Sequence, residues 1–416
     1  MERRNWGGNY QYRAAEVAVP RSVEELRELT VRSEKLKALG SRHSFNGIAD
    51  TTAMQVSLER LNRVIHLDRE RLLVKVEGGI RYGELCDVLH KQGYALHNLA
   101  SLPHISVAGA IATGTHGSGD RNGSLSTAVH ALEIVTADGS LIELCRDDAE
   151  GDFAGSVVSL GGMGFVTAIT LEMVPAFNVR QDVYEGLPLA LLEEHLEDIF
   201  SCAYSVSLFT DWKAAAFHQV WVKRIEAPDL DVPTELHGAL AARTPLHPVP
   251  GHGAVHCTEQ LGIYGPWHER LPHFRMGFTP SSGEELQSEY FVPRARAFEA
   301  LCAVERLRAD IAPLLYVCEV RTVAADDLWL SPSYGRDSVG IHFTWKPDEA
   351  AVRNELPRIE DALAPYEARP HWGKVFTMPP EQVMALYEKH ADFRELLLRW
   401  DPQGKFSNEY LSAYIY

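Results

Sequence analysis

The stretch that decides the fold lies between residues 107 and 119 and reads Val107-Ala108-Gly109-Ala110-Ile111-Ala112-Thr113-Gly114-Thr115-His116-Gly117-Ser118-Gly119. Two other glycine groups precede it, Gly40-Ser41-Arg42-His43-Ser44-Phe45 and Gly78-Gly79. Such loops let backbone N–H groups approach a pyrophosphate without an intervening Cβ, and Ser and Thr hydroxyls add donors. Tight turns would explain any single group. The three groups together favour a large phosphorylated cofactor.

The glycine groups do not match the common nucleotide-binding motifs. No G-x-G-x-x-G lies between a strand and a helix with an acidic residue downstream, and no G-x-x-x-x-G-K-[ST] loop occurs. The expected cofactor would therefore not be held in the Rossmann manner.

Composition limits the class of protein. The 416 residues suffice for two domains, and the 45 % hydrophobic content is ordinary for a globular protein. The formal net charge of −17 disfavours nucleic acid and membrane surfaces as partners. The six cysteines are scattered without a C-x-x-C pair, which indicates reduced thiols and a cytoplasmic protein.

Local patterns predict several elements of the first half. We expect a helix opened by the Ser22/Glu25 capping box and a second helix over 82–92 that ends at Gly93. Strands are expected at 35–39 and 72–77, and a strand pair within 157–173. Asp138-Gly139 predicts a hairpin that joins strands at 133–137 and 140–144. Pro175 marks a boundary, after which the composition changes to longer amphipathic segments. The pattern is typical of an α+β protein.

His43 is the sharpest single candidate in the glycine-rich loops. It follows a strand and a Gly-Ser turn, so its imidazole would project from a phosphate-binding loop. The alternative is a solvated or hydrogen-bonded bystander, as many loop histidines are.

Motifs along nearly the whole chain resemble the vanillyl-alcohol-oxidase family of flavoproteins, and within it the alditol (xylitol) oxidases. In the first half the resemblance rests on residues 40–46, 100–109 and 113–119. In the second half it rests on residues 205–212, 257–260, 285–290, 318–326, 342–345 and 371–376. The early motifs are shared by many flavin enzymes of this fold, whereas the later ones are specific to alditol oxidases.

The resemblance implies a two-domain FAD-binding fold of the vanillyl-alcohol-oxidase (PCMH) type with a mixed-sheet substrate-binding cap domain. The expected division is 1–175 for the FAD-binding domain, 176–378 for the cap, and 379–416 for a segment that returns to the FAD domain. It also implies FAD bonded through its 8α-methyl to His43. No cysteine lies between Cys86 and Cys145, so a single histidyl bond is expected. The residues expected to bind the cofactor are Gly40, Ser41, Arg42, His43, Ser44, Ser101, Ser106, Gly109, Thr113, Gly114, Thr115, His116, Val166 and His371.

Oxidation of an alcohol by a flavin needs a base for the hydroxyl proton and a carbinol carbon placed for hydride transfer. The family pattern puts Lys374 and His342 at the reacting hydroxyl, and either could be the base. Taken alone, Lys374 would be read as a surface lysine and His342 as a strand histidine with structural hydrogen bonds.

Further polar residues are expected to bind the substrate. Glu319 and Arg321 alternate on a predicted strand and so share a face, either as a structural ion pair or as a pair that binds substrate hydroxyls. Thr344 lies two residues from His342. Ser101 and Gln287 are expected at the distal hydroxyls.

The predicted function is oxidation of the terminal primary alcohol of alditols such as xylitol and sorbitol to the aldose, with O2 reduced to H2O2, by a monomeric enzyme. The Gly-Ser-Arg-His loop with Glu319, Arg321 and Lys374 leaves open an aldonolactone oxidase or dehydrogenase of the same fold. A redox-inactive sugar- or metal-binding protein is the alternative from another class. We expect no metal, because the 18 histidines include no H-E-x-x-H or comparable ligand spacing.

Overall fold

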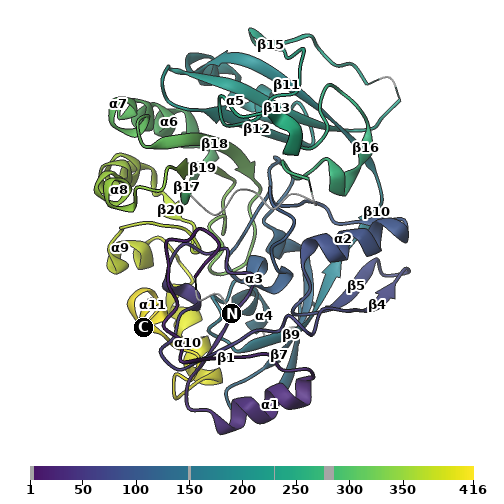
Figure 1. Ribbon diagram of the computed structural model, residues 1–416, viewed down its shortest axis with the longest axis vertical. Coiled ribbons are helices and arrows are strands. Elements are labelled where there is room, and N and C mark those ends of the chain that lie inside the picture. Colours follow the sequence, from purple (N-terminus) through teal and green to yellow (C-terminus); the bar gives the residue numbers. More distant parts are fainter. Residues whose placement is uncertain (1–3, 149–150, 229, 276–284) are drawn as a thin grey trace.

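The computed structural model describes residues 4–148, 151–228, 230–275 and 285–416, and its two halves are each organised around β-sheets. Among these residues, one half holds three smaller sheets, of three, five and two strands, and the first four helices, and the other half holds a single large sheet (Figure 1). The last three helices, yellow in Figure 1, lie beside the half with the small sheets.

The half with the small sheets contains the glycine-rich loops. A parallel three-stranded sheet has the order β1 (Glu16–Ala18), β3 (Met54–Val56), β2 (Leu36–Ala38). An antiparallel sheet has the order β4 (Val64–Asp68), β5 (Leu73–Glu77), β9 (Phe165–Glu172), β7 (Val129–Val135), β8 (Leu141–Cys145). The helices are α1 (Val23–Arg32), α2 (Tyr82–Lys91), α3 (Val107–Ala112) and α4 (Asp152–Val157), and the short strands β6 (Tyr94–Ala95) and β10 (Val174–Pro175) pair with each other.

Most of the local predictions for this half are confirmed. The Ser22 hydroxyl accepts a hydrogen bond of 3.1 Å from the Glu25 amide and caps α1. Gly93 follows α2 with a φ of +84°, a conformation that favours glycine after a helix. The hairpin of β7 and β8 turns at Gly139, whose φ is +81°.

The predicted strand pair within 157–173 is wrong in its first half. Residues up to Val157 form α4, and only β9 follows as a strand. Leu160 and Gly161 turn the chain with φ values of +54° and +66°. A short apolar run such as Val157 to Leu160 reads equally well as a buried helix end, which is why periodicity did not separate the two.

The large sheet extends from residue 178 to residue 370. Its order is β14 (Glu235–Leu236), β15 (Ala239–Ala241), β11 (Asn178–Pro188), β13 (Ala216–Ile225), β12 (Ser205–Thr210), β18 (Leu315–Val323), β19 (Ser338–Trp345), β17 (Leu286–Pro293), β20 (Arg369–Pro370), and β16 (Gly265–Pro266) pairs with β11. Four helices belong to it: α5 (Leu192–Ser201), α6 (Ala297–Glu305), α7 (Arg308–Ile311) and α8 (Glu349–Leu363).

The sheet corrects one detail of the expected fold. We expected a mixed sheet, but every pairing among its described strands is antiparallel. The topology explains why the pairings are antiparallel. The chain passes from β17 through α6 and α7 to β18, and β19 then lies between β17 and β18 in the sheet. This split β-α-β arrangement separates the two parallel strands, so each neighbour is antiparallel.

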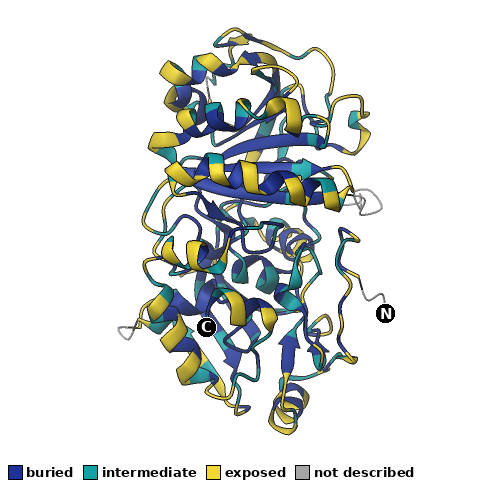
Figure 2. Cartoon of the chain, turned by 90° about the vertical axis from the view of Figure 1, so that its left-hand side faces the viewer, coloured by how far each residue is buried: buried dark blue, intermediate teal, exposed yellow. Residues whose placement is uncertain are grey.

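Helices cover one face of the large sheet, and polar side chains lie on the other face. Buried strands with exposed outer helix faces are visible in Figure 2. Along β18, Cys318 and Val320 belong to the main hydrophobic core, whereas Glu319 and Arg321 line a cavity. Because side chains alternate along a strand, the cavity residues share one face of the sheet.

The three C-terminal helices close the structure against the N-terminal half. They are α9 (Pro380–Ala385), α10 (His390–Trp400) and α11 (Glu409–Tyr414). Arg399 of α10 donates a hydrogen bond of 2.7 Å to Asp152 of α4, and the Asn408 amide donates to the carbonyl oxygens of Gly47 and Ile48. In the described part of the chain, none of the helices combines the length and apolar character that a membrane span needs.

Candidate active site

A cavity of about 870 Å³ lies between the glycine-rich loops and the polar face of the large sheet. Its lining includes almost all of the predicted site residues, which come from widely separated parts of the sequence. From the loop half these are Gly40, Ser41, Arg42, His43, Ser44, Ser101, Ser106, Gly109, Thr113, Thr115, His116 and Val166. From the sheet half they are Gln287, Glu319, Arg321, His342, Thr344, His371 and Lys374.

Gly114 is the one predicted site residue that does not line the cavity. Its φ is +67°, and a Cβ there would lie 3.0 Å from Pro332. Its backbone shape forms the turn that presents Thr113 and Thr115.

His43 has the environment of a neutral imidazole with an available ring nitrogen. Its Nδ1 lies 3.1 Å from the Ser41 hydroxyl, and its ring stacks on Trp6 with a centroid distance of 5.3 Å. Its Nε2 is buried and has no hydrogen-bond partner among the described residues. Burial, aided by His104, lowers the pKa of His43 to about 4, so the ring is neutral and nucleophilic at neutral pH.

The loops around Ser106 leave room for a group that brings its own hydrogen-bond acceptors. The Ser106 hydroxyl is buried without a hydrogen-bond partner in the described structure. A Cβ on Gly40 or Gly109 would lie only 2.9 or 2.7 Å from that oxygen. A buried hydroxyl normally has a partner. A phosphorylated cofactor such as FAD therefore fits these residues.

Glu319 and Arg321 form the centre of a buried polar row on β18. Glu319 Oε1 lies 2.7 Å from His273 Nε2 and 3.6 Å from Arg321 Nε. Burial alone would raise the pKa of Glu319, but Arg321 and His273 outweigh it and hold that pKa well below its usual range. The carboxylate is thus ionised and able to accept hydrogen bonds from a polyol.

Glu289 of β17 is a second buried carboxylate, and it joins both sides of the cavity. Its Oε1 lies 3.1 Å from His116 Nε2 and accepts a hydrogen bond of 2.9 Å from Arg321. Its Oε2 accepts one of 2.5 Å from Lys374. Burial opposes ionisation, but Lys374, His116 and Arg321 together hold the pKa of Glu289 well below its usual range.

Lys374 and His342 are in direct contact. Lys374 Nζ lies 2.6 Å from His342 Nδ1, and His342 Nε2 lies 3.1 Å from the Thr344 hydroxyl. Burial, reinforced by Lys374, lowers the pKa of His342 to about 4. Burial also lowers the pKa of Lys374, an effect that Glu289 opposes. The protonation states of Lys374 and His342 therefore determine which of the two side chains can accept the substrate proton.

The segment after β20 is fixed to β17 by its backbone. The His371 amide donates to the carbonyl oxygen of Glu289 (2.9 Å), and the Val375 amide donates to that of Gln287 (2.8 Å). Burial, together with Lys374, lowers the pKa of His371 well below its usual range, so this ring is neutral. These bonds hold His371 and Lys374 against the cavity.

The sequence analysis did not name several polar residues of the cavity, among them Glu289, Glu285 and His273. Glu289 is two residues from Gln287, so the period of a strand could have placed both on one face. Glu285 accepts a hydrogen bond of 2.7 Å from Gln287 and follows the same period. His273 lies in a loop and carries no local signal.

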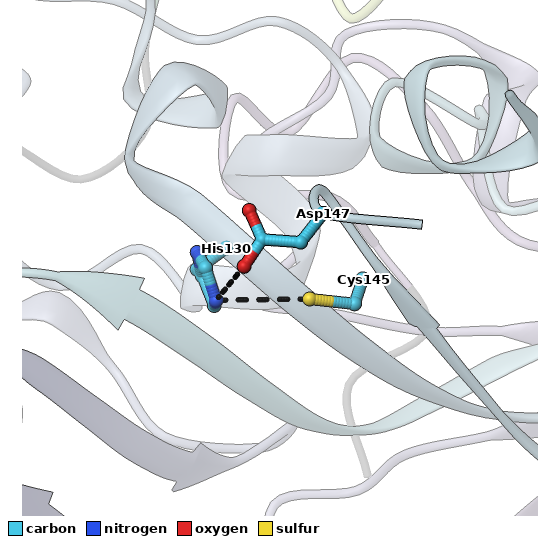
Figure 3. Close-up of side chains that lie close together, drawn as sticks. All are labelled: His130, Cys145 and Asp147. Carbon is cyan, nitrogen blue, oxygen red and sulfur yellow. Dashed lines mark hydrogen bonds and ion pairs between the residues drawn. The ribbon is translucent and has the colours of Figure 1, made fainter. Parts of the chain in front are cut away.

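Among the described residues, two groups of possible metal ligands lie away from the cavity. His130 Nε2 lies 3.6 Å from both Cys145 Sγ and Asp147 Oδ2 (Figure 3). The Arg71 guanidinium lies 3.3 Å from the same nitrogen and 3.8 Å from Asp147. A metal ion there would meet that positive charge, so the group is better described as an ion-paired cluster.

The second group is formed by His195, Asp198 and His237. The two imidazole rings stack at 4.3 Å with an interplanar angle of 28°. Nitrogen lone pairs of stacked rings lie in nearly parallel planes, which is a poor geometry for a shared metal ion.

Family models match both parts of the chain that contribute residues to the cavity. A family model described as FAD binding domain matches residues 14–144, and one described as D-arabinono-1,4-lactone oxidase matches residues 282–414. An alditol oxidase of a Streptomyces species is 50 % identical over 410 residues, covering 98 % of this chain and 97 % of the relative. An L-gulono-1,4-lactone dehydrogenase of Mycobacterium tuberculosis is 28 % identical, with coverage of 98 % and 97 %.

The fold is shared with a more distant protein of known structure. Cholesterol oxidase from B. sterolicum superposes with a TM-score of 0.78 at 14 % identity, covering 99 % of this chain and 96 % of that chain. This confirms the predicted class of fold.

Proposed function

The chain belongs to the vanillyl-alcohol-oxidase family of FAD-dependent enzymes, and on that premise we propose that it is an alditol oxidase. It oxidises the terminal primary alcohol of a polyol such as xylitol or sorbitol to the aldose, and O2 is reduced to H2O2. The observation that carries this proposal is the row of buried, ionised side chains on the large sheet, which faces the glycine-rich loops across one cavity.

The loop half would hold the cofactor. His43 would carry it through an 8α-histidyl bond, because the ring is neutral and has a buried nitrogen without a hydrogen-bond partner among the described residues. Gly40, Ser106 and Gly109 provide the space and the hydroxyl for its phosphates. When bound, FAD supplies a two-electron acceptor for a hydride.

The sheet half would hold the polyol. Glu319 accepts hydrogen bonds from substrate hydroxyls, Arg321 donates to them, and Thr344, Ser101 and Gln287 extend the row. A simple alkanol would leave these buried groups unpaired, and a site of this kind discriminates strongly against such analogues. Lys374 and His342 would meet the reacting hydroxyl, where they control its proton.

The second candidate is oxidation of an aldonolactone. It is favoured by the family model matched at residues 282–414 and by the lactone-converting relative. The lower identity of that relative, 28 % against 50 %, favours the alditol.

The experiment is a peroxide assay in air with xylitol, L-gulono-1,4-lactone and a simple alkanol. The proposal expects peroxide from xylitol well above both comparison substrates. Turnover of the lactone without turnover of xylitol would assign the second candidate. A yellow protein that is silent on all three substrates would mean another substrate or acceptor, and a colourless one would contradict FAD itself.

We further propose a monomeric, cytoplasmic enzyme. All six cysteines are free, which suits a reducing compartment. Light scattering that gives a mass of one chain would support the monomer, and a dimer mass would contradict it.

A further inference from the structure

The proton of the reacting hydroxyl has two candidate acceptors, Lys374 and His342, and their assignment rests on the proposed function. Lys374 Nζ has two recorded partners among the described residues, Glu289 Oε2 at 2.5 Å and His342 Nδ1 at 2.6 Å. Its side chain is 13 % exposed and lines the cavity. An ammonium has three N–H donors, so one remains for a substrate oxygen.

The surrounding charges favour a protonated Lys374. Arg321 and Glu319 face the pair from β18, Glu289 from β17, His116 from the loop after α3, and His371 from the segment after β20. The two carboxylates outnumber the single guanidinium by one negative charge, while His371 is neutral. Glu285 lies before β17, and burial raises its pKa while Gln287 and Lys374 oppose that shift. Lys223 is a further buried amine of this network, 3.2 Å from His273 on the far side of Glu319. The ammonium of Lys374 is therefore favoured by its direct contact of 2.5 Å with the ionised Glu289.

His342 is then the member of the pair that has a lone pair, and in this structure that lone pair faces Lys374. The ring is neutral, and its Nδ1 faces Nζ, which can only donate as an ammonium. The ring proton therefore sits on Nε2, next to the Thr344 hydroxyl. An ammonium has no lone pair and cannot accept the substrate proton.

We propose that Glu289 is a positioning residue that fixes Lys374 as a cation, and that His342 Nδ1 is therefore the catalytic base. The substrate hydroxyl enters the contact between the two side chains, so that its oxygen accepts from Lys374 Nζ and its proton points at His342 Nδ1. The O–H bond breaks as an Nδ1–H bond forms. With FAD bound, the carbinol hydrogen would leave with its electron pair to that two-electron acceptor, so that the alcohol becomes a carbonyl. Lys374 remains an ammonium and stabilises the developing negative charge on oxygen.

The first experiment compares Lys374→Arg with Lys374→Met in xylitol turnover. Arginine keeps the positive charge but cannot act as a base at any accessible pH. If Lys374 is the cation, the arginine variant retains at least about tenfold more activity than the methionine variant, which loses about 10²–10³-fold. If the two variants are equally inactive while His342→Gln stays active, Lys374 is the base and the proposal is overturned.

The second experiment tests Glu289 through the pH profile of kcat. Loss of the ammonium defines the alkaline limb, and the neighbouring carboxylate raises the pH at which it occurs. In Glu289→Gln this limb moves to lower pH by about 1–3 units, the shift expected when an opposite charge within 4–6 Å is removed. Glu289→Asp keeps the charge and holds the limb nearer to its wild-type position. A limb that does not move in Glu289→Gln would contradict the positioning role.

Glu360→Gln is the matched control. Glu360 is also a buried carboxylate, and it accepts a hydrogen bond of 2.8 Å from Tyr290 on the same strand as Glu289. It contacts neither Lys374 nor the cavity, so its variant keeps the wild-type limb even if its stability falls. Xylitol turnover by the wild-type enzyme tests the proposed function separately, because that result does not depend on which residue is the base. If Glu289→Gln does not fold, the arginine and methionine pair still decides the assignment of the base.

Discussion

The side-chain amide of Asn46 donates a hydrogen bond of 2.9 Å to the main-chain oxygen of Lys374. The same amide donates one of 2.8 Å to the carbonyl oxygen of Trp372. The Phe45 amide adds a third connection by donating to the Gly373 oxygen at 2.7 Å. The loop that carries His43 is thus fastened directly to the segment that carries Lys374, although more than 300 residues separate them in sequence.

Replacement of Asn46 by alanine tests this connection. It removes the side-chain donor of the Lys374 main-chain oxygen, which costs about 1–3 kcal/mol, and it loosens Lys374 relative to the cofactor loop. The Trp372 oxygen also loses the Asn46 bond but keeps the hydroxyl of Tyr410 as a donor. We expect kcat with xylitol to fall more than the thermal stability explains. Asn408→Ala is the control, because its amide also donates to main-chain oxygens, at residues 47, 48 and 50, but not to the 371–374 segment. Equal losses of kcat per folded enzyme in both variants would contradict the prediction.

His43→Ala is expected to abolish covalent attachment of the flavin. The readouts are the mass of the denatured chain and flavin fluorescence on a denaturing gel. His97→Ala is a matched control, because His97 also has a buried Nε2 without a hydrogen-bond partner in the described structure, yet it does not line the cavity. A flavin that stays attached in His43→Ala would refute the linkage.

Glu319→Gln is expected to weaken alditol binding rather than folding. The amide cannot replace the ionised acceptor between Arg321 and His273, so kcat/KM for xylitol should fall by about 10–200-fold, equivalent to about 1–3 kcal/mol. Steady-state kinetics would show the loss mainly in KM. Glu355→Gln removes a buried carboxylate that pairs with Arg358 on α8 and should leave KM unchanged. A Glu319 variant with wild-type KM would contradict the proposed binding role.

Because the amine of Lys37 is buried, we expect the free energy of unfolding to depend on pH. Its Nζ donates to the carbonyl oxygens of Leu160, Gly161 and Phe406, and burial lowers its pKa to about 7 from 10.5. Between these two values the unfolded chain binds the proton and the folded chain does not. The free energy of unfolding therefore increases as the pH rises from about 7 to 10.5, by up to about 1.4 kcal/mol per pH unit.

The contribution of Lys37 is measured by urea unfolding at several pH values in that window. We expect the slope of unfolding free energy against pH to decrease in Lys37→Met relative to the wild type. Lys405→Met is the control, because Lys405 also donates to a main-chain oxygen, that of Thr30, but is partly exposed. Identical slopes in the wild type and Lys37→Met would show that the buried amine does not titrate there.

Local sequence patterns determined the elements whose causes are local. The capping box at Ser22, the turn at Gly139 and the helix end at Gly93 each depend on residues within a few positions of one another. Almost all of the site residues that the family motifs indicated line the cavity, and the alternation on β18 placed Glu319 and Arg321 together. The failure at 157–164 shows the limit, since a short apolar run has no period of its own.

Only the tertiary structure decided which charges meet. The register of the large sheet sets Glu289 and Glu319 opposite His342 on its two sides, and the segment after β20 brings Lys374 to the same point. A shift of one residue in either pairing would turn the affected side chains to the helix-covered face. The sequence by itself determined the residue types that the chemistry needs. Their protonation states depend on burial and on charges that lie within a few ångströms only after the sheet and the loops have folded together.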